Sequence, residues 1–287
     1  MDGGMEIQWY PGHMAKARRM LTEHLKLIDV VVEVIDARAP KATRNPDFDG
    51  LFANKTRVVL LNKADLADPA ATKAWIAYFT GQGMAAAGIN ATEKGAKSAA
   101  AALIEKAARP KVEAWKAKGV NKVVRCMVAG IPNVGKSTLI NRMAGASRAQ
   151  VGDRPGVTKG KQWVRVTPYL ELMDTPGLLW PKLEDAECAR HLAFLGSIND
   201  EIMDTEALAA SLLAELLALC PEAVGQRYGG LTPDMEGQTL LETVAAGRGF
   251  LLRGGEADIQ RAARIVLDEY RGGRIAKVSL EQAEALG

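Results

Sequence analysis

The residues best suited to chemistry form a loop between an apolar stretch and a helical pattern. Residues 130–137 read G-I-P-N-V-G-K-S, which is the G-x-x-x-x-G-K-[ST] spacing of a phosphate-binding P-loop. Backbone N–H groups in such a loop surround phosphate oxygens, and the positive end of the following helix strengthens their attraction. Lys136 can reach the β- and γ-phosphates, and the Ser137 hydroxyl suits Mg²⁺. We therefore expect nucleotide contacts from the second half of the loop, from Asn133, Val134, Gly135, Lys136, Ser137 and Thr138.

A second motif follows another apolar stretch, residues 57–61, and predicts the choice of base. Asn62-Lys63-Ala64-Asp65 has the N-K-x-D pattern. The Asp65 carboxylate can accept hydrogen bonds from the guanine N1–H and amino group, and adenine has no matching donors there. The Lys63 stem can pack along the base. The alternative for a four-residue motif is a polar surface turn, which its position after an apolar strand disfavours.

Three further elements complete a candidate nucleotide site. Asp174-Thr175-Pro176-Gly177 follows an apolar stretch and supplies a carboxylate for Mg²⁺, from Asp174, and a backbone N–H for the γ-phosphate, from Gly177. Thr158, in a glycine-rich loop, can add a hydroxyl to the same metal ion. Asn90-Ala91 is the loosest element, and its backbone is expected to meet the guanine O6. Together these elements predict binding of GTP or GDP with Mg²⁺.

The order of these motifs is unusual. In a Ras-like domain the P-loop comes first and N-K-x-D comes last, whereas here N-K-x-D begins at residue 62 and the P-loop at residue 130. The set is a circular permutation, which is feasible because domain termini often lie close together. One consequence is that the loop 174–177 leads directly into the C-terminal part. We expect γ-phosphate contacts at this loop to reposition that part.

The positioning elements alternate between strand and helix in the first part of the chain. Strand patterns occur at 30–35, 57–61, 84–89, 123–129, 162–166 and 169–173, with helical patterns at 15–26, 68–80 and 97–118. Such alternation predicts an α/β fold with a mainly parallel sheet and helices on both faces. From residue 181 onward only helical periodicity remains, at 185–194, 205–219, 238–246 and 257–270. We expect a GTPase domain over residues 1–180 and a small all-helical domain over 181–287.

Composition sets bounds on the class of protein. The 287 residues have a net charge of +3, which is mildly basic and does not by itself indicate nucleic acid. Cys126, Cys188 and Cys220 are far apart and show no C-x-x-C pair, which argues against a zinc module or a disulfide framework and for a reducing compartment. No secretory signal is visible, and the most apolar segment, 207–220, is too short to span a bilayer. These features predict a cytoplasmic protein without a membrane partner.

The motifs together resemble the circularly permuted ribosome biogenesis GTPase A family (YlqF/RbgA). The resemblance rests on N-K-x-D, G-x-P-N-V-G-K-S and D-T-P-G in this order, preceded by W-Y-P-G-H-M-A-K-A at 9–17 and D-A-R-x-P at 36–40. It implies GTP hydrolysis during late assembly of the large (50S) ribosomal subunit, with rRNA and ribosomal proteins as partners and stimulation by that subunit. We expect the protein to act as a monomer.

The resemblance also implies how hydrolysis proceeds without the usual glutamine. That position is Leu178, which cannot orient water. The family assigns the missing role to the histidine of P-G-H-M, here His13, which the residues alone would leave as an exposed turn residue. It further implies a K⁺ ion held partly by Asn133 near the β- and γ-phosphates. The expected catalytic residues are thus His13, Lys136 and Thr158.

Several alternatives remain open from the residues alone. Lys16, Arg18 and Arg19, and Arg261, Arg264, Arg271 and Arg274, are candidate RNA contacts, but each group also fits a solvated polar face. The protein is either a GTP-hydrolysing assembly factor or an RNA-docking module that nucleotide only stabilises. Leu178 favours the docking module for the isolated protein, and stimulation by the large subunit would favour the enzyme. A P-loop ATPase is disfavoured by Asp65.

Overall fold

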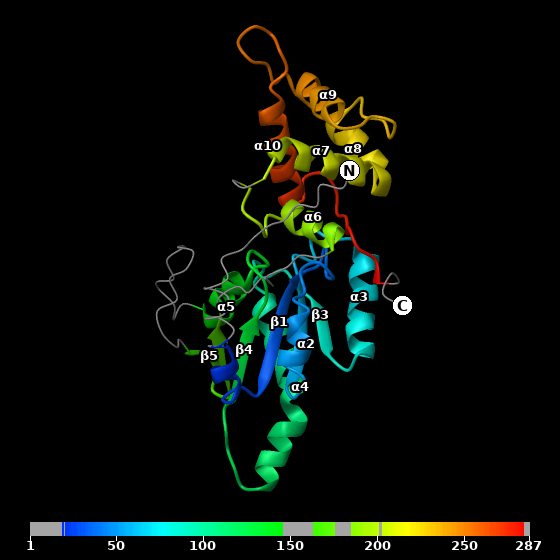
Figure 1. The fold of residues 1–287 in the computed structure, drawn as a ribbon. Coiled ribbons are helices and arrows are strands. Elements are labelled where there is room, and N and C mark those ends of the chain that lie inside the picture. Colours follow the sequence, from blue (N-terminus) through cyan, green and yellow to red (C-terminus); the bar gives the residue numbers. More distant parts are fainter. Residues whose placement is uncertain (1–18, 20, 146–162, 176–184, 201–202, 284–287) are drawn as a thin grey trace.

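The computed structural model describes residues 19, 21–145, 163–175, 185–200 and 203–283 (Figure 1). Within them, six strands form one sheet in the order β3-β2-β1-β4-β6-β5. Every neighbouring pair is parallel except β5 and β6. The strands are β1 Val30–Asp36, β2 Thr56–Asn62, β3 Ala85–Gly88, β4 Val124–Ala129, β5 Trp163–Thr167 and β6 Leu170–Asp174.

Helices cover both faces of the sheet, which explains why β1 is buried along its whole length. Val30, Val32 and Val34 face the side covered by α4 (Ala96–Ala117) and α5 (Lys136–Ala144). Val31 and Ile35 face the opposite side, with α2 (Asp47–Leu51) and α3 (Pro69–Gly81). Side chains alternate between the two faces of a strand, so a continuous apolar run serves two helical layers at once.

Local sequence signals fix several helix boundaries. The Asp68 carboxylate accepts a hydrogen bond from Ala71 N at 2.6 Å and so caps α3, and Pro69 occupies the first turn. The helix α4 continues through Pro110 rather than restarting there. Its buried residues end at Ala108, so the remaining turns extend beyond the sheet at the lower end of Figure 1.

A helical part follows the sheet in the chain. It contains α6 Ala186–Phe194, α7 Thr205–Leu219, α8 Pro221–Tyr228, α9 Gln238–Arg248 and α10 Ile259–Arg271. The helices α7, α9 and α10 pack on one another and form the upper end of the molecule in Figure 1. The α/β fold with a helical C-terminal region is therefore confirmed. No helix among the described residues is long and apolar enough to cross a membrane.

A segment after α10 returns to the sheet, and we call residues 278–281 the strap. Leu280 N donates to Arg38 O at 2.8 Å, and Trp75 Nε1 donates to Glu281 O at 3.1 Å. The Glu281 carboxylate accepts from the backbone N of Lys41 at 2.6 Å. The strap therefore ties the helical part to the loop that follows β1.

The strap also completes a buried cluster of charge. His191 on α6 is 1% exposed, and its two ring nitrogens lie 2.9 Å from Glu281 Oε1 and 2.8 Å from Glu215 Oε1 on α7. Burial alone would lower the pKa of His191, but the two carboxylates outweigh it and raise that pKa to about 9. A positive His191 therefore holds α6, α7 and the strap together.

Candidate functional site

The P-loop lies between the end of β4 and the start of α5, and its two glycines are required by close contacts. Gly130 has φ +154°, and a Cβ there would lie 2.4 Å from Val34 O on β1. Gly135 has φ +95°, and a Cβ there would lie 2.2 Å from Asn62 Nδ2. Both backbone conformations favour glycine, and both sites lack room for a side chain. The motif spacing thus reflects the packing of the loop against β1 and β2.

Lys136 is held within the P-loop itself. Lys136 is 7% exposed, and its Nζ donates to Ile131 O at 2.5 Å. Burial lowers the pKa of Lys136 to about 8, against a smaller opposing effect of the Asp174 carboxylate. A neighbouring phosphate would therefore stabilise the charged form of this lysine strongly.

Asn62 joins the base side of the site to the phosphate side. Its Nδ2 donates to Val134 O in the P-loop at 2.8 Å, and its Oδ1 accepts from Ala91 N at 2.9 Å. All three residues are buried. The two elements that Asn62 connects are far apart in the sequence, and the side chain fixes their separation at the end of β2.

Lys63 connects the same two sides through charge. Nζ donates to Asn133 O at 3.0 Å and lies 2.9 Å from Asp36 Oδ2 at the end of β1. Lys63 and Asn133 both have positive φ, 59° and 62°, which is uncommon outside glycine. Such strain persists only where surrounding contacts hold it, and it is frequent at functional sites.

Asp36 and Arg38, which belong to the D-A-R-x-P motif, form a buried ion pair that the sequence alone does not predict. Both are 1% exposed, and Arg38 Nη2 lies 2.8 Å from Asp36 Oδ2. Burial would raise the pKa of Asp36, but the charges of Arg38 and Lys63 hold it well below its usual range. Arg38 Nη1 also donates to Tyr270 O and Arg271 O at the end of α10, each at 3.2 Å. The pair thus links the base side of the site to the helical part.

The edge of the site next to β4 carries the groups that suit a metal ion. Asp174 ends β6, which pairs with β4, and Ser137 is exposed in the first turn of α5. Thr175 Oγ1 donates to Val128 O at 2.6 Å and fixes the end of β6 against β4. Carboxylate and hydroxyl oxygens are ligands that Mg²⁺ accepts, so these residues fit the predicted ion.

The site also touches the helical part directly. Asn133 Nδ2 donates to Gly196 O, just after α6, at 2.6 Å. On the other side, Leu66 follows the N-K-x-D motif and packs against Gly273, where a Cβ would lie 2.6 Å from Leu66 Cδ2. Both halves of the nucleotide site are therefore in contact with the segments that border α6 and α10.

The remaining predicted residues lie as follows. Asp65 is half-buried, and Thr138 is exposed on α5. Asn90 Oδ1 accepts from Thr92 N at 3.0 Å, so this side chain shapes its own loop. Ala91 N is bound to Asn62. His13, Thr158 and Gly177, like Leu178, lie outside the described residues.

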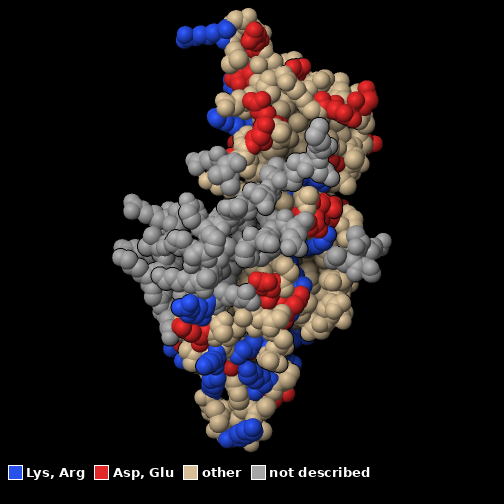
Figure 2. All heavy atoms as spheres, viewed as in Figure 1, with Lys and Arg blue, Asp and Glu red and all other residues tan. Residues whose placement is uncertain are grey.

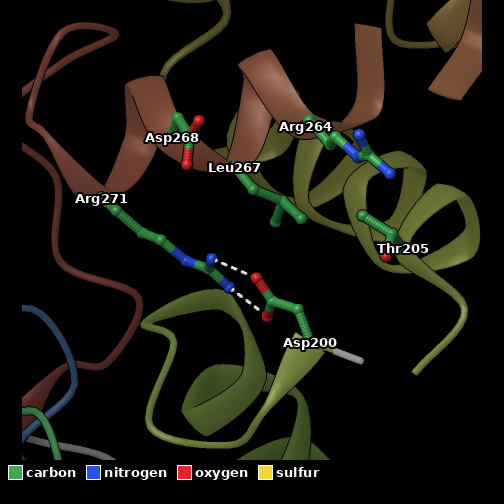
Figure 3. Close-up of a pocket in the computed structure, with 6 residues that line it drawn as sticks. All are labelled: Asp200, Thr205, Arg264, Leu267, Asp268 and Arg271. Carbon is green, nitrogen blue, oxygen red and sulfur yellow. Dashed lines mark hydrogen bonds and ion pairs between the residues drawn. The ribbon is translucent and has the colours of Figure 1, made fainter. Parts of the chain in front are cut away.

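Two arginines have roles that the sequence did not reveal. Arg271 was a candidate RNA contact, but its guanidinium donates to Ala193 O and Phe194 O and forms an ion pair with Asp200 (Figure 3). Arg271 and Asp200 line a cavity of about 340 Å³, together with Arg264 on the same helix as Arg271. Arg271 is thus occupied in joining α10 to the segment after α6. A charged pair directly after a buried strand was the available signal for Arg38, but its distant partners were not visible.

The strand order, with the motif residues at the ends of β2, β4 and β6, defines a circularly permuted P-loop GTPase. A sequence profile described as "50S ribosome-binding GTPase" matches residues 125–217, which begin on β4 and exclude the N-K-x-D half. The chain is 44% identical to Ribosome biogenesis GTPase A of Bacillus cereus, over 99% of this chain and 96% of the relative. It is 34% identical to the protein of that name from Thermotoga maritima, over 97% and 95%. The chain belongs to the ribosome biogenesis GTPase A family.

Solved structures agree with this assignment. The GNP-bound crystal structure of YlqF from T. maritima has a TM-score of 0.66 and 30% identity, and the match covers 94% of this chain and 99% of that one. The GDP-bound structure gives a TM-score of 0.64 and 29% identity, with 93% and 100% covered. The protein binds guanine nucleotide and is a GTP hydrolase of ribosome biogenesis.

Proposed function

We propose that the protein hydrolyses GTP as a factor in late maturation of the large ribosomal subunit, and that this subunit stimulates the reaction. The observation that supports the enzymatic part is the bridge through Asn62. It holds the loop after β3 and the P-loop at a fixed separation, and Lys63 adds a bond to Asn133 O in the P-loop. The names of the relatives, together with the 50S-binding profile, supply the ribosomal part.

On the base side, Asp65 accepts the guanine N1–H and amino group, and Lys63 covers one face of the ring. Asn62 positions the loops through its bonds to Val134 O and Ala91 N. Its Nδ2 has a second hydrogen, which it offers to the guanine base. Asn90 and Ala91 form the wall next to the guanine O6. A carboxylate that a bound base covers without offering it a donor is costly, so this arrangement discriminates against adenine.

On the phosphate side, the P-loop backbone from Asn133 to Thr138 surrounds the β- and γ-phosphates. Lys136 exchanges its bond to Ile131 O for phosphate oxygens and becomes fully charged. Ser137 and Asp174 would hold Mg²⁺ together with Thr158, and the ion would supply positive charge against the phosphates. The Gly177 N–H contacts the γ-phosphate. Asn133, whose side chain is exposed, offers an amide oxygen to K⁺ while its Nδ2 remains bonded to Gly196 O.

Hydrolysis requires a group that orients water, and we assign this role to His13 by the family resemblance. Leu178 occupies the position of the usual glutamine and has no polar atom. Because the water-orienting group then comes from another segment, contact between that segment and the large subunit would account for stimulation. This makes the isolated protein a slow enzyme.

We further propose that the chain divides near residue 180 into a GTPase domain, 1–180, and a helical domain, 181–287. The sheet ends at Asp174, and α6 to α10 pack mainly on one another. We also propose a monomer that works in the cytoplasm with rRNA and ribosomal proteins of the 50S subunit. Sedimentation of the purified protein tests whether it is a monomer.

The experiment that tests the function is GTP turnover in potassium buffer with Mg²⁺, with and without purified 50S subunits. We expect strong stimulation by the subunits, and its loss in His13→Ala while GTP binding stays intact. Stimulation that survives in His13→Ala would move the catalytic group elsewhere. Absence of any stimulation of the wild type by mature or immature 50S particles would favour the RNA-docking module over the enzyme.

A further inference from the structure

The edge of the sheet opposite the nucleotide site concentrates positive charge. Parallel strands place their starting ends at one edge, and here Asp29, Lys55 and Lys122 lie just before β1, β2 and β4. The extended end of α4 reaches the same edge. We call this the basal surface, and its members are Lys55, Lys111, Trp115, Lys116, Lys118 and Lys122.

The charge of the basal surface is not balanced within the protein. Five lysines face two acidic side chains, Asp29, which is 4% exposed, and Glu113. The excess of three positive charges equals the formal net charge of the whole chain, +3, so the other residues balance one another. Figure 2 shows the same asymmetry, with Lys and Arg gathered at the lower end of the molecule and few acidic groups among them.

Several of these ammonium groups crowd one carboxylate. Lys111 Nζ and Lys122 Nζ lie 3.2 and 3.3 Å from the same oxygen of Asp29. Lys55 Nζ donates to Ile28 O at 2.9 Å next to them. Burial and then the charge of Lys111 lower the pKa of Lys55, with a further contribution from Lys122. The repulsion between these lysines would be relieved by an added polyanion.

Trp115 holds two of the lysines in place. Lys122 Nζ lies 4.7 Å and Lys111 Nζ 5.8 Å from the centre of its ring. Such cation–π contacts restrict long side chains and reduce the entropy lost when they bind a partner. Tyr169, which directly precedes β6, lies at the same edge of the sheet and is 73% exposed.

We propose that the basal surface binds the phosphate backbone of RNA, at the end of the GTPase domain opposite the nucleotide. This rests on the proposed function, because ribosomal RNA is then the polyanion that the protein meets. A regular row of phosphates matches several fixed ammonium groups better than scattered carboxylates of an acidic protein. The arrangement leaves the nucleotide site and the helical part accessible to other components of the ribosome.

The test uses fluorescence anisotropy with a labelled 24-base-pair RNA duplex over a series of KCl concentrations. The variant Lys111→Gln/Lys116→Gln/Lys118→Gln leaves the Asp29–Lys122 pair intact. The control Lys73→Gln/Arg253→Gln/Lys277→Gln removes the same charge from exposed positions elsewhere. Thermal melting and basal GTP turnover verify that both variants are folded.

We expect the basal variant to bind the duplex at least roughly tenfold more weakly near 0.1 M KCl and its log–log salt slope to fall by about 2–3, since each lysine–phosphate contact contributes about one unit. The control should retain wild-type affinity. Equal losses of affinity in both variants would overturn the proposal. A wild type that does not bind the duplex would also overturn it, even if these lysines contributed to 50S binding through a ribosomal protein.

The same variants separate this inference from the proposed function. If 50S subunits stimulate wild-type turnover but the basal variant binds RNA normally, RNA binding by the basal surface is refuted and the proposed function stands. If the basal variant loses RNA binding but 50S subunits never stimulate the wild type, the RNA contact stands and the function is refuted.

Discussion

Replacement of Asn62 gives the sharpest test of how the site is built. In Asn62→Ala, Val134 O loses its donor and Ala91 N loses its acceptor. Val134 and Ala91 are 0% and 1% exposed, so water does not readily replace the missing partner. Each buried group left unsatisfied costs about 1–3 kcal/mol, and the free energy of unfolding should fall by about 2–6 kcal/mol in total.

Asn62→Asp separates the two hydrogen bonds. The carboxylate still accepts from Ala91 N, but its second oxygen faces Val134 O, which repels it unless the carboxyl is protonated. Its folded-state pKa is therefore raised above the ordinary value of about 3.9. A raised folded-state pKa means that the folded state binds more protons, so this variant is most stable at low pH and loses stability as the pH rises through that pKa.

The assays are urea unfolding and titration with a fluorescent GDP analogue, at pH 6 and pH 8. Asn62→Ala should weaken GDP binding on the order of tenfold or more at both pH values, since the base and phosphate loops are no longer held together. Asn62→Asp should recover part of its stability and affinity at pH 6. Asn54→Ala, at an exposed position, is the control. Wild-type stability and affinity in Asn62→Ala would refute the bridge.

Three further predictions follow from single groups. Asp65→Asn should abolish or reverse the preference for GTP over ATP in competition binding, and unchanged selectivity would remove the assignment. The pKa of His191 is about 9 in the folded state and 6.5 in the unfolded state, so raising the pH from 6.5 to 9 should lower the free energy of unfolding by about 3 kcal/mol. In urea unfolding, His191→Gln should flatten this pH dependence. GTP affinity at constant ionic strength should fall above pH 8, as Lys136 loses its proton before binding but keeps it beside phosphate; a flat profile to pH 9 would contradict the buried environment of Lys136.

The sequence predicted the parts of the fold that depend on local patterns. Continuous apolar runs gave the strands, since β1 and β2 are buried on both faces. The Asp68-Pro69 pair gave the start of α3. Helix α8 was missed because Pro221 follows Cys220 and suggests a break, although proline at the first position of a helix is favourable. The short α2 lacks enough turns to show a period.

The candidate site was predictable in its composition but not in its connections. Motif spacing predicts which residues meet the nucleotide, because P-loop geometry imposes that spacing. The bonds of Asn62 to residues 29 and 72 positions away, and of Arg38 to the end of α10, depend on how the elements pack. No local pattern encodes such contacts. The two carboxylates around His191 were hidden for the same reason.

The pairing of β1 with β4 has a consequence for the cohesion of the chain. In the proposed site, the segments that bind the guanine base precede the exposed turn 119–121, and the segments that bind the phosphates follow it. A cut in that turn would leave two fragments joined by the β1–β4 ladder, the Asn62–Val134 bond and the strap. Nucleotide in the proposed site would contact both fragments. Its binding would therefore strengthen the free energy of association of the fragments by RT ln(1 + [L]/Kd). A nicked GTPase would be a two-piece protein whose integrity rises with the concentration of GDP or GTP.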